Sequence, residues 1–378
     1  YTVRNTLSLH DALPISVPLR ERSHPPTGPM RIVHINLERS WRGGERQVLY
    51  LMEGLRGLGH ESHLIARVNE GFVSRAMDRG FPVHVISKPY LCRGRLLSGF
   101  DVVHAHETRG LQVAAAWKVL NGRPLIFTRR VDNSPSRNPL TRLVYGRIDR
   151  MGVISRVISR VMTAWGFEPA RIRVIPSAVK TERMASADAV SQLKARFGAK
   201  RVVGCVASLE WRKDHHTLLR AASIIQGLRD DVAFVLVGDG ALRPDLEKEA
   251  QRLGLKNVVF EGYQDDPYPY YLLFDLFVMT SKQEGLGSAI LDAFAHEVPV
   301  VATDAGGIPE IVRHGDTGLL VDTGNAGQVA QAVLRMLEDE DLRQRCTHNA
   351  RKLLEMGYSI DGMARAYERI YREVTVHG

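Results

Sequence analysis

The 378-residue chain lacks the features that define several common classes of protein. It contains no run of about 18 consecutive apolar residues, so we expect no membrane-spanning helix. Its three cysteines, Cys92, Cys205 and Cys346, are far apart, and none belongs to a CxxC or Cys/His cluster with zinc-site spacing. This pattern predicts a reduced, cytosolic protein rather than a disulfide scaffold or a zinc domain.

Binding motifs for several ligands are missing as well. No G-x-G-x-x-G follows a strand-like segment, which excludes a dinucleotide-dependent dehydrogenase. No set of side chains has the spacing of metal ligands, so we expect neither a metal ion nor a bound cofactor. Aromatic residues make up only 7% and are not interleaved with the arginines, so we expect no nucleic-acid partner.

What the chain does contain is a strongly uneven distribution of charge. Residues 30–180 carry 25 Lys and Arg against 11 Asp and Glu, a net charge of +14. Residues 181–378 carry 23 against 29, a net charge of −6. The first half is therefore expected to face an anionic partner, such as a phosphorylated substrate or a membrane surface. The alternative is a solvated arginine-rich surface without a specific role.

The first 29 residues differ from the rest of the chain. They show no periodic apolar face, and they end in a proline-rich stretch. Residues 6–15, TLSLHDALPI, resemble a translated adapter oligonucleotide and lack the continuous apolar segment of a signal peptide. We therefore expect residues 1–29 to be a non-native or disordered extension, with Met30 as the natural start.

Strand-like and helix-like patterns alternate from Met30 onward, which predicts an α/β fold with parallel, doubly wound sheets. The length suggests two domains. We expect a Rossmann-like N-terminal domain over residues 30–180 and a second one over 181–358, with a linker region at 177–199. Two such domains leave a cleft beyond the carboxyl ends of their strands. The last helical stretch, 359–378, is expected to cross back to the N-terminal domain.

The most informative motif spans Ser281–Val312, SKQEGLGSAILDAFAHEVPVVATDAGGIPEIV. A strand is expected to end just before it, and a helix is expected to start near Ser288. Backbone N–H groups at a helix N-terminus bind anions, and Gly285 and Gly287 allow a phosphate to approach closely. Glu284 precedes the turn and Asp292 lies about two helical turns beyond it. Both carboxylates are therefore expected to face one pocket and to accept hydrogen bonds from sugar hydroxyls.

This segment resembles the Glu-x7-Glu signature of the retaining family-4 glycosyltransferases, which have the two-Rossmann GT-B architecture. The trailing Pro-Val-Val-Ala and Gly-Gly-x-Pro-Glu blocks strengthen the resemblance, which covers essentially residues 30–375. The resemblance implies that Glu284 contacts the transferred sugar and that the amides of Leu286 to Ser288 hold the donor diphosphate. It assigns Asp292, where the family usually has Glu, to the ribose.

Two further loops of the second domain gain roles from the same resemblance. Lys213 stands where the family places the lysine that contacts the donor diphosphate, and Arg212 is expected to assist it. Ser208 replaces the arginine that the family often has five residues earlier. Gly262 and Tyr263 are expected to touch the nucleobase, largely through backbone groups. The Asp-x-Asp motif of metal-dependent glycosyltransferases of the other major fold is absent, so we expect no metal requirement.

The first domain carries candidates for the acceptor side of the cleft. Gly43 and Gly44 resemble the glycine loop that approaches the donor phosphates or the acceptor, and His106 matches a strand-end position near the transferred sugar. His106 is expected to face the cleft, whereas His104 is expected to be buried in the sheet. Further side chains are expected to contact an acceptor phosphate or carboxylate or to line its loop: Thr108, Arg109, Arg129 and Arg130.

Together these observations predict a retaining, metal-independent glycosyltransferase that moves a sugar from a nucleotide-diphosphate sugar. The expected acceptor is a cell-envelope glycan or glycolipid, such as a lipopolysaccharide-core intermediate. The protein is expected in the cytoplasm, in peripheral contact with an anionic membrane. A nucleotide-sugar 2-epimerase of the same fold is one alternative. A non-catalytic protein that binds an anionic polymer is an alternative from a different class.

Overall fold

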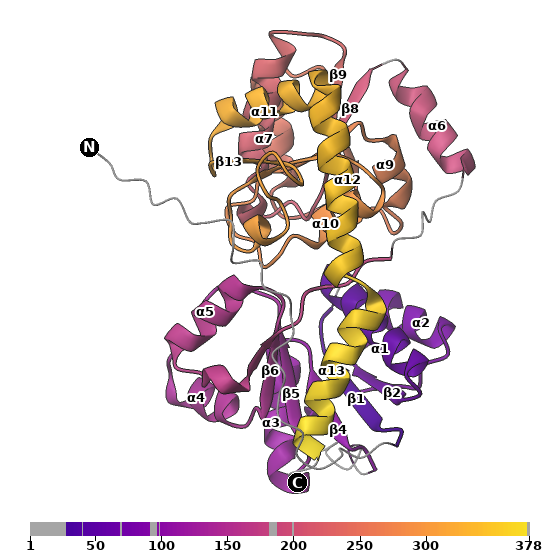
Figure 1. Ribbon diagram of the computed structural model, residues 1–378, viewed down its shortest axis with the longest axis vertical. Coiled ribbons are helices and arrows are strands. Elements are labelled where there is room, and N and C mark those ends of the chain that lie inside the picture. The colour runs from indigo at the N-terminus through magenta and orange to yellow at the C-terminus, as the bar shows by residue number, and fades with distance from the viewer. Residues whose placement is uncertain are drawn as a thin grey trace.

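The computed structural model describes residues 28–39, 41–68, 70–90, 97, 99–180, 187–198 and 200–375. Two lobes, each built on one parallel sheet, stack along the long axis of the molecule (Figure 1). Most of the expected extension at 1–29, as well as Cys92, lies outside the described residues. The other two cysteines, Cys205 and Cys346, are buried free thiols.

The N-terminal lobe holds a seven-stranded sheet in the order β3-β2-β1-β4-β5-β6-β7, with every pairing parallel. Its strands are β1 Arg31–Asn36, β2 Glu61–Ala66, β3 Val83–Val85, β4 Val102–Ala105, β5 Leu125–Arg129, β6 Arg150–Val153 and β7 Ile172–Val174. Its helices are α1 Gly43–Gly57, α2 Glu70–Asp78, α3 Thr108–Asn121, α4 Pro139–Gly146 and α5 Arg156–Trp165, with a short 3-10 turn η2 at Pro169–Arg171. The central strands are buried almost throughout because helices cover both faces of a parallel sheet.

The C-terminal lobe holds a six-stranded parallel sheet in the order β10-β9-β8-β11-β12-β13. Its strands are β8 Arg201–Val206, β9 Val232–Val237, β10 Val258–Gly262, β11 Leu276–Met279, β12 Val300–Thr303 and β13 Leu319–Val321. Its helices are α6 Ala187–Phe197, α7 His215–Gln226, α8 Arg243–Arg252, α9 Tyr268–Leu273, α10 Ser288–Ala295, α11 Ala326–Glu338 and α12 Glu340–Gly357. Two 3-10 turns, η3 Trp211–Lys213 and η4 Ile308–Glu310, lie in its loops.

Helix α6 corrects the interpretation of residues 177–199 as a linker region. Leu193 and Phe197 stand four residues apart on this helix and pack against the core, and α6 contacts α9. Residues four apart share one face of a helix, so this short apolar pair is enough to anchor it. The part of the predicted linker at 181–186 lies outside the described residues.

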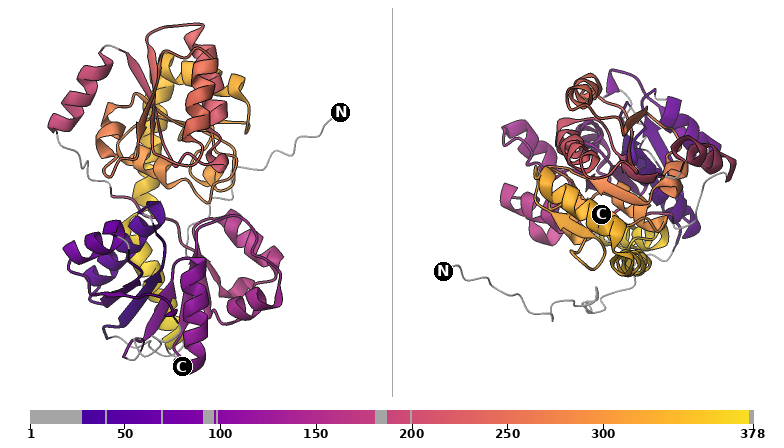
Figure 2. Two further views of the ribbon diagram at one scale, coloured as in Figure 1. Left: turned by 180° about the vertical axis from the view of Figure 1, so that it is seen from behind. Right: turned by 90° about the horizontal axis from the view of Figure 1, so that it is seen from above.

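The last helix, α13 (Ile360–Thr375), leaves the C-terminal lobe and packs along α1 in the N-terminal lobe (Figures 1 and 2). Tyr367 and Tyr371 are fully buried there. Tyr371 Oη is 2.7 Å from His104 Nδ1, and Tyr367 Oη is 2.6 Å from Thr128 Oγ1. The end of the chain therefore closes one face of the N-terminal sheet and links the two lobes a second time.

The packing of α1 on α13 can be tested at two glycines of the same helix. A Cβ at Gly54 would lie 2.7 Å from the Cβ of Ala364, whereas a Cβ at Gly57 would meet nothing within 4 Å. We expect Gly54→Ala to lower the free energy of unfolding by about 1–3 kcal/mol relative to Gly57→Ala, because it overpacks the contact. Urea denaturation of both variants measures the difference. Equal stabilities would show that α13 does not pack tightly on α1 in solution.

Candidate active site

A tight turn between β11 and α10 forms the centre of the site in the C-terminal lobe. Gly287 caps α10 with φ of 92°, a left-handed conformation that favours glycine, and α10 receives no side-chain hydrogen bond at this end. The side chain of Leu286 is buried, which fixes the turn on the core. The first N–H groups of α10 therefore have no intrahelical partner and are suited to an anion.

Lys213 and Glu284, which lie 71 residues apart in the sequence, form an ion pair beside this turn. Lys213 belongs to the 3-10 turn η3 after β8, and Glu284 follows β11. Their side chains are only 20% and 15% exposed. The structure thus brings the two predicted catalytic side chains together at the edge where parallel strands β8 and β11 end.

The other predicted residues of η3 and its loop lie at the margin of the site. Arg212 donates to Glu210 at 3.1 Å, and Glu210 also accepts from Arg42 of the N-terminal lobe at 3.0 Å. The carbonyl of Ser208 accepts from the backbone N–H of Glu210 at 2.9 Å. Glu210 therefore orients Arg212 and joins this loop to the facing lobe.

The two lobes touch at the turn itself. A Cβ at Gly43 would lie 3.1 Å from Ser288 Oγ, and a Cβ at Gly285 would overlap the carbonyl oxygen of Arg130. Gly43 and Gly44 form the first turn of α1 rather than a free loop. The glycines allow backbone-to-backbone approach, so the N-terminal lobe forms one wall of the anion-binding turn.

The Gly-Gly-x-Pro-Glu block contributes a second junction. The carboxylate of Glu310 accepts from the backbone N–H groups of Arg156 at 2.9 Å and Val157 at 3.0 Å. These are the first residues of α5 in the N-terminal lobe, whose cap is Ser155. A carboxylate at a helix N-terminus is stabilised by the helix dipole and by free N–H groups, so Glu310 fixes the lobes relative to each other.

His106 follows β4 as expected, but it does not face the open cleft. It is 4% exposed, and its Nε2 is 2.9 Å from Nδ1 of His34 on β1. His104 is buried as predicted, with its two ring nitrogens 2.7 Å from Tyr371 Oη and Thr128 Oγ1. The correction arises because the neighbouring strand and α13 enclose the end of β4. Sequence reasoning missed His34, whose link to His106 depends on strand pairing between β1 and β4.

The three imidazoles form a buried cluster whose ligand atoms lie within 4.8 Å of one another. Sequence spacing does not predict such a group. Burial lowers the pKa of His34 to about 3 and the pKa values of His104 and His106 well below their usual range. All three side chains are therefore neutral near pH 7. Each makes a hydrogen bond within the N-terminal lobe, through which the cluster positions the end of β4.

Arg129 and Arg130 are both predicted to contact the acceptor, and the structure separates them. Arg129 is 4% exposed, donates to Tyr145 Oη at 2.9 Å and also donates to the carbonyl of Asn133. Arg129 is therefore a structural side chain, which corrects the prediction. Neighbouring side chains of a strand point to opposite faces, so Arg130, just after β5, points the other way, toward Gly44.

Asp292 does not face an open ribose pocket. Its carboxylate is buried and pairs with Arg46 of α1 at 2.5 Å, while Arg46 also donates to Tyr268 Oη at 3.2 Å. Burial raises the pKa of Asp292, and the nearby Arg46 opposes this shift. An arginine from the other lobe therefore engages the carboxylate to which the resemblance assigns the ribose, and that assignment stays a prediction. No sequence signal links Arg46 to Asp292, because they lie 246 residues apart.

The remaining predicted residues lie on the rim. Gly262 ends β10 with φ of 72° and bridges to Gly238, and Tyr263 beside it is 55% exposed. Thr108 and Arg109 are exposed in the first turn of α3. These positions leave Gly262 and Tyr263 beside the C-terminal ends of the strands, where a nucleotide base is expected.

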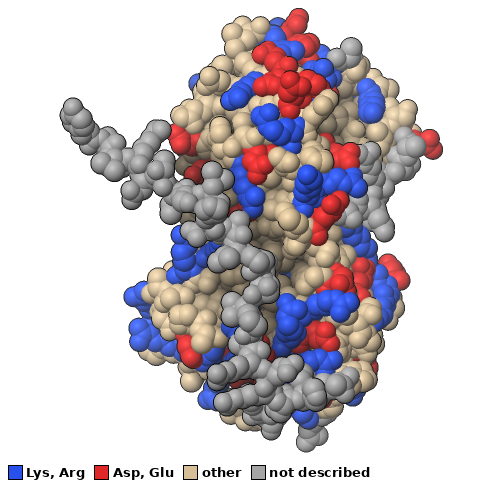
Figure 3. Space-filling model, in the orientation of Figure 1, with Lys and Arg blue, Asp and Glu red and all other residues tan. Residues whose placement is uncertain are grey.

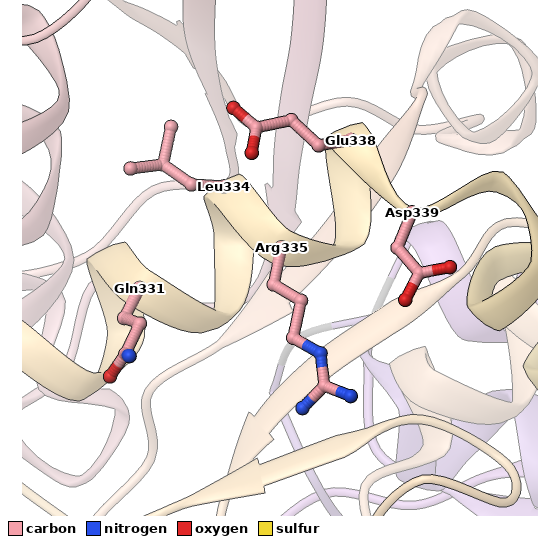
Figure 4. A pocket seen from close by; sticks show the side chains of 5 residues that line it. All are labelled: Gln331, Leu334, Arg335, Glu338 and Asp339. Carbon is pink, nitrogen blue, oxygen red and sulfur yellow. The ribbon is translucent and has the colours of Figure 1, made fainter.

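A hollow on α11 lies apart from this site. Its lining side chains come from a single helix and the residue after it, and Figure 4 shows them pointing in different directions. They are Gln331, Leu334, Arg335, Glu338 and Asp339. Side chains that diverge do not make a binding pocket, so we assign no function to this hollow.

Comparison with known proteins identifies the family. Residues 189–353 match the family described as "Glycosyl transferases group 1", and residues 41–183 match "Glycosyltransferase Family 4". The lipopolysaccharide core biosynthesis glycosyltransferase LpsE of Rhizobium meliloti is 30% identical over 351 residues, which cover 89% of this chain and 98% of LpsE. The chain belongs to this glycosyltransferase family.

Other relatives of the glycosyltransferase agree with this assignment. A Mycobacterium tuberculosis GDP-mannose-dependent alpha-(1-6)-phosphatidylinositol monomannoside mannosyltransferase is 36% identical over 220 residues, which cover 54% of this chain and 57% of that protein. The Anabaena protein HepE, solved in complex with UDP and glucose, superposes with a TM-score of 0.82 at 21% identity, covering 90% of this chain and 99% of HepE. The predicted GT-B fold of two facing Rossmann-like domains is confirmed.

No helix among the described residues of the glycosyltransferase is both long and apolar enough to cross a membrane.

The histidine cluster predicts how stability depends on pH. Its pKa values are depressed in the folded state, so the unfolded chain binds more protons than the native one below pH 6.5. Each buried histidine is then expected to remove on the order of 1 kcal/mol of stability per pH unit once the pH falls below 6.5. Urea denaturation between pH 7 and pH 5 should show a shallower slope for His34→Asn than for the wild type. The exposed control His348→Gln should keep the wild-type slope, and equal slopes for all three proteins would contradict a buried neutral cluster.

Proposed function

We propose that the glycosyltransferase transfers a sugar from a nucleotide-diphosphate donor with retention of anomeric configuration. The observation that carries the proposal is the Lys213–Glu284 ion pair beside the open N-terminus of α10, with Gly43 of the other lobe against Ser288. This arrangement offers a cation and backbone N–H groups to a diphosphate and a carboxylate to a sugar hydroxyl.

Lys213 and the amides of Leu286 to Ser288 stabilise negative charge as the nucleoside diphosphate departs. We assign Arg212 an assisting role because it precedes Lys213 in η3 and pairs with Glu210 alone among the described side chains. Glu284 accepts hydrogen bonds from the transferred sugar. Once a diphosphate and a sugar are bound, each member of the Lys213–Glu284 pair exchanges its partner for a substrate group.

We propose front-face transfer through an oxocarbenium-like transition state. The sequence holds no obvious in-line nucleophile for double displacement, and the proposal assigns Glu284 to the hydroxyls of the sugar rather than to its anomeric carbon. In the proposed step the acceptor oxygen bonds to the anomeric carbon as the bond to the leaving phosphate oxygen breaks. The acceptor proton moves to an oxygen of the departing diphosphate, which therefore acts as the base.

We propose that the reaction needs no metal ion. The adjacent acids Asp265 and Asp266 do not form an Asp-x-Asp motif, and Asp265 pairs with Arg75 of the N-terminal lobe. The diphosphate charge is then balanced by Lys213, Arg212 and the helix N-terminus. The nucleotide-sugar 2-epimerase alternative requires an acid/base pair at the sugar C2, and the sequence shows no distinct acid/base set for this role.

Transfer assays in excess EDTA test this site and its chemistry. We expect wild-type turnover to persist in EDTA. We expect Lys213→Ala and Glu284→Gln each to lower kcat/KM by roughly 100- to 1,000-fold, the size of effect seen when one hydrogen-bond donor to a transition state is removed. A panel of nucleotide sugars, scored by donor hydrolysis and by product analysis, identifies the donor. The exposed control Lys248→Ala should match the wild type.

Three results would contradict the proposal. These are loss of turnover in EDTA with recovery on adding magnesium or manganese, near-wild-type rates for both site variants, and a 2-epimerised nucleotide sugar as the product.

We propose a cell-envelope glycan or glycolipid as the acceptor, reached at the cytoplasmic face of the membrane. The relatives named for lipopolysaccharide core and phosphatidylinositol monomannoside support this acceptor class. Helix α4 supports the membrane contact, because Leu140 and Leu143 are 66% and 58% exposed one turn apart. Exposed arginines also lie on α4, on α5 and in the adjoining loops, and Figure 3 shows blue side chains on this side of the lower lobe. They are Arg137, Arg142, Arg147, Arg156 and Arg160.

Such a surface suits reversible docking on an anionic leaflet, since each basic residue contributes about 1 kcal/mol within a Debye length.

We expect the wild-type protein to sediment with vesicles containing anionic lipid at low salt and less with neutral vesicles. Leu140→Ser/Leu143→Ser should reduce sedimentation several-fold. Leu228→Ser, which removes an exposed leucine of the other lobe, should leave sedimentation unchanged. Equal binding to neutral and anionic vesicles would exclude electrostatic docking.

A further inference from the structure

Arg130 is a cationic side chain at the junction of the lobes that the proposed donor chemistry does not use. Its Nε is buried without a hydrogen-bond partner. Among the described residues, no side chain or carbonyl forms a hydrogen bond or ion pair with its guanidinium group. Burial lowers the pKa of Arg130 although Tyr367 and Glu45 lie nearby and act in the opposite direction. Arg130 as a whole is partly exposed, so a ligand can reach it. A cationic side chain with a buried N–H that lacks a hydrogen-bond partner is suited to binding an anion.

Glu45, the acid that acts electrostatically on Arg130, does not satisfy it. The carboxylate of Glu45 is already engaged: Oε1 accepts from Asn36 Nδ2 at 3.2 Å, and Oε2 accepts from the backbone N–H of Arg42 at 3.0 Å. Burial raises the pKa of Glu45, and its hydrogen bonds to Asn36 and to the backbone act in the opposite direction. The neighbouring His104 and His106 are neutral and buried, so they supply no negative charge that could balance the guanidinium.

The groups around the Arg130 side chain belong to the N-terminal lobe and to α13, which packs on this lobe. Its Cδ lies 3.8 Å from the Cβ position of Gly44, in the first turn of α1. The first amides of a helix have no intrahelical acceptor, so Gly43 and Gly44 present N–H groups near the same place. The groups that act electrostatically with the guanidinium are His104, His106 and Glu45 of this lobe and Tyr367 of α13. The proposed function assigns the donor diphosphate to Lys213 and the amides of α10, which belong to the C-terminal lobe.

We propose that Arg130 binds an anionic group of the acceptor, a phosphate monoester or a carboxylate, near the hydroxyl that receives the sugar. This inference rests on the proposed function, since it presumes that the opposite wall holds the donor. A guanidinium binds either anion with two parallel hydrogen bonds, which fixes orientation as well as position. The anion would neutralise the unpaired charge and hold the acceptor hydroxyl facing the anomeric carbon.

Thermal shift measurements with inorganic phosphate test the site without knowledge of the acceptor. UDP, GDP and ADP are first compared, and the nucleoside diphosphate that gives the largest Tm shift is chosen. The protein is saturated with this nucleotide so that the donor site is filled, and phosphate is then titrated. Sodium chloride at equal ionic strength is the reference. We expect phosphate to raise the wild-type Tm further and in a saturable way, while Arg130→Gln abolishes this second shift and Arg130→Lys keeps part of it.

Further variants distinguish an acceptor site from a donor site. Arg130→Gln should keep the wild-type shift with nucleoside diphosphate and donor hydrolysis within about twofold of the wild type. Arg123→Gln removes an exposed arginine of the same lobe that belongs to neither proposed surface, and it should keep both shifts. Lys213→Ala should weaken the nucleoside diphosphate shift but keep the response to phosphate. Because the Arg130 guanidinium has no partner among the described residues, its replacement is expected to leave the fold intact, which circular dichroism checks.

Two outcomes would overturn the inference. If Arg130→Gln retains the phosphate shift, the guanidinium binds no anion there. If Arg130→Gln instead loses the nucleoside diphosphate shift, Arg130 serves the donor and not the acceptor. Failure of the proposed function looks different, because no nucleoside diphosphate would then shift the wild-type Tm. Phosphate titration of the wild type and of Arg130→Gln without nucleotide would still test the anion site in that case.

Discussion

The structure depends on close backbone contact between the facing edges of its two sheets. Gly285 lies so close to the carbonyl of Arg130 that no side chain fits there, and Gly43 lies against Ser288, where a side chain would make a tight contact. Neither lobe holds a complete site by itself. The anion-binding turn belongs to one lobe and its covering wall to the other, so the chemistry requires the lobes to be correctly placed.

Several contacts of different strength maintain this placement. Helix α13 buries two tyrosines in the N-terminal lobe, and Glu310 caps the N-terminus of α5 across the junction. The buried Arg46–Asp292 pair adds a directed link between α1 and α10, whereas the more exposed Arg42–Glu210 pair contributes less because water screens it. Removing one partner of the buried pair would leave an uncompensated charge, so this contact is specific to one arrangement of the lobes.

Charge is divided between the lobes in a way that matches two kinds of anion. The C-terminal lobe has a net negative formal charge over residues 181–378 and meets a diphosphate with a few directed groups: Lys213, Arg212 and the amides of one helix terminus. The N-terminal lobe has a large excess of arginine. One of these, Arg130, lies inside the junction without a partner among the described residues, while the arginines around α4 face outward. Arginine thus serves two purposes in this lobe: Arg130 forms a local anion site, and the outward-facing arginines create a positive electrostatic potential at the surface.

The sequence by itself determined the α/β architecture, the two domains and the turn from Glu284 to Ser288. These features depend on local periodicity and on glycines that only a tight turn before a helix requires. Tertiary structure decided which side chains are available. Arg129 and Arg130 are adjacent in sequence, yet strand alternation buries one against Tyr145 and directs the other into the junction. Asp292 pairs with Arg46 because the lobes pack together, and His106 contacts His34 because their strands pair. Both partners come from distant segments, which no local sequence pattern encodes.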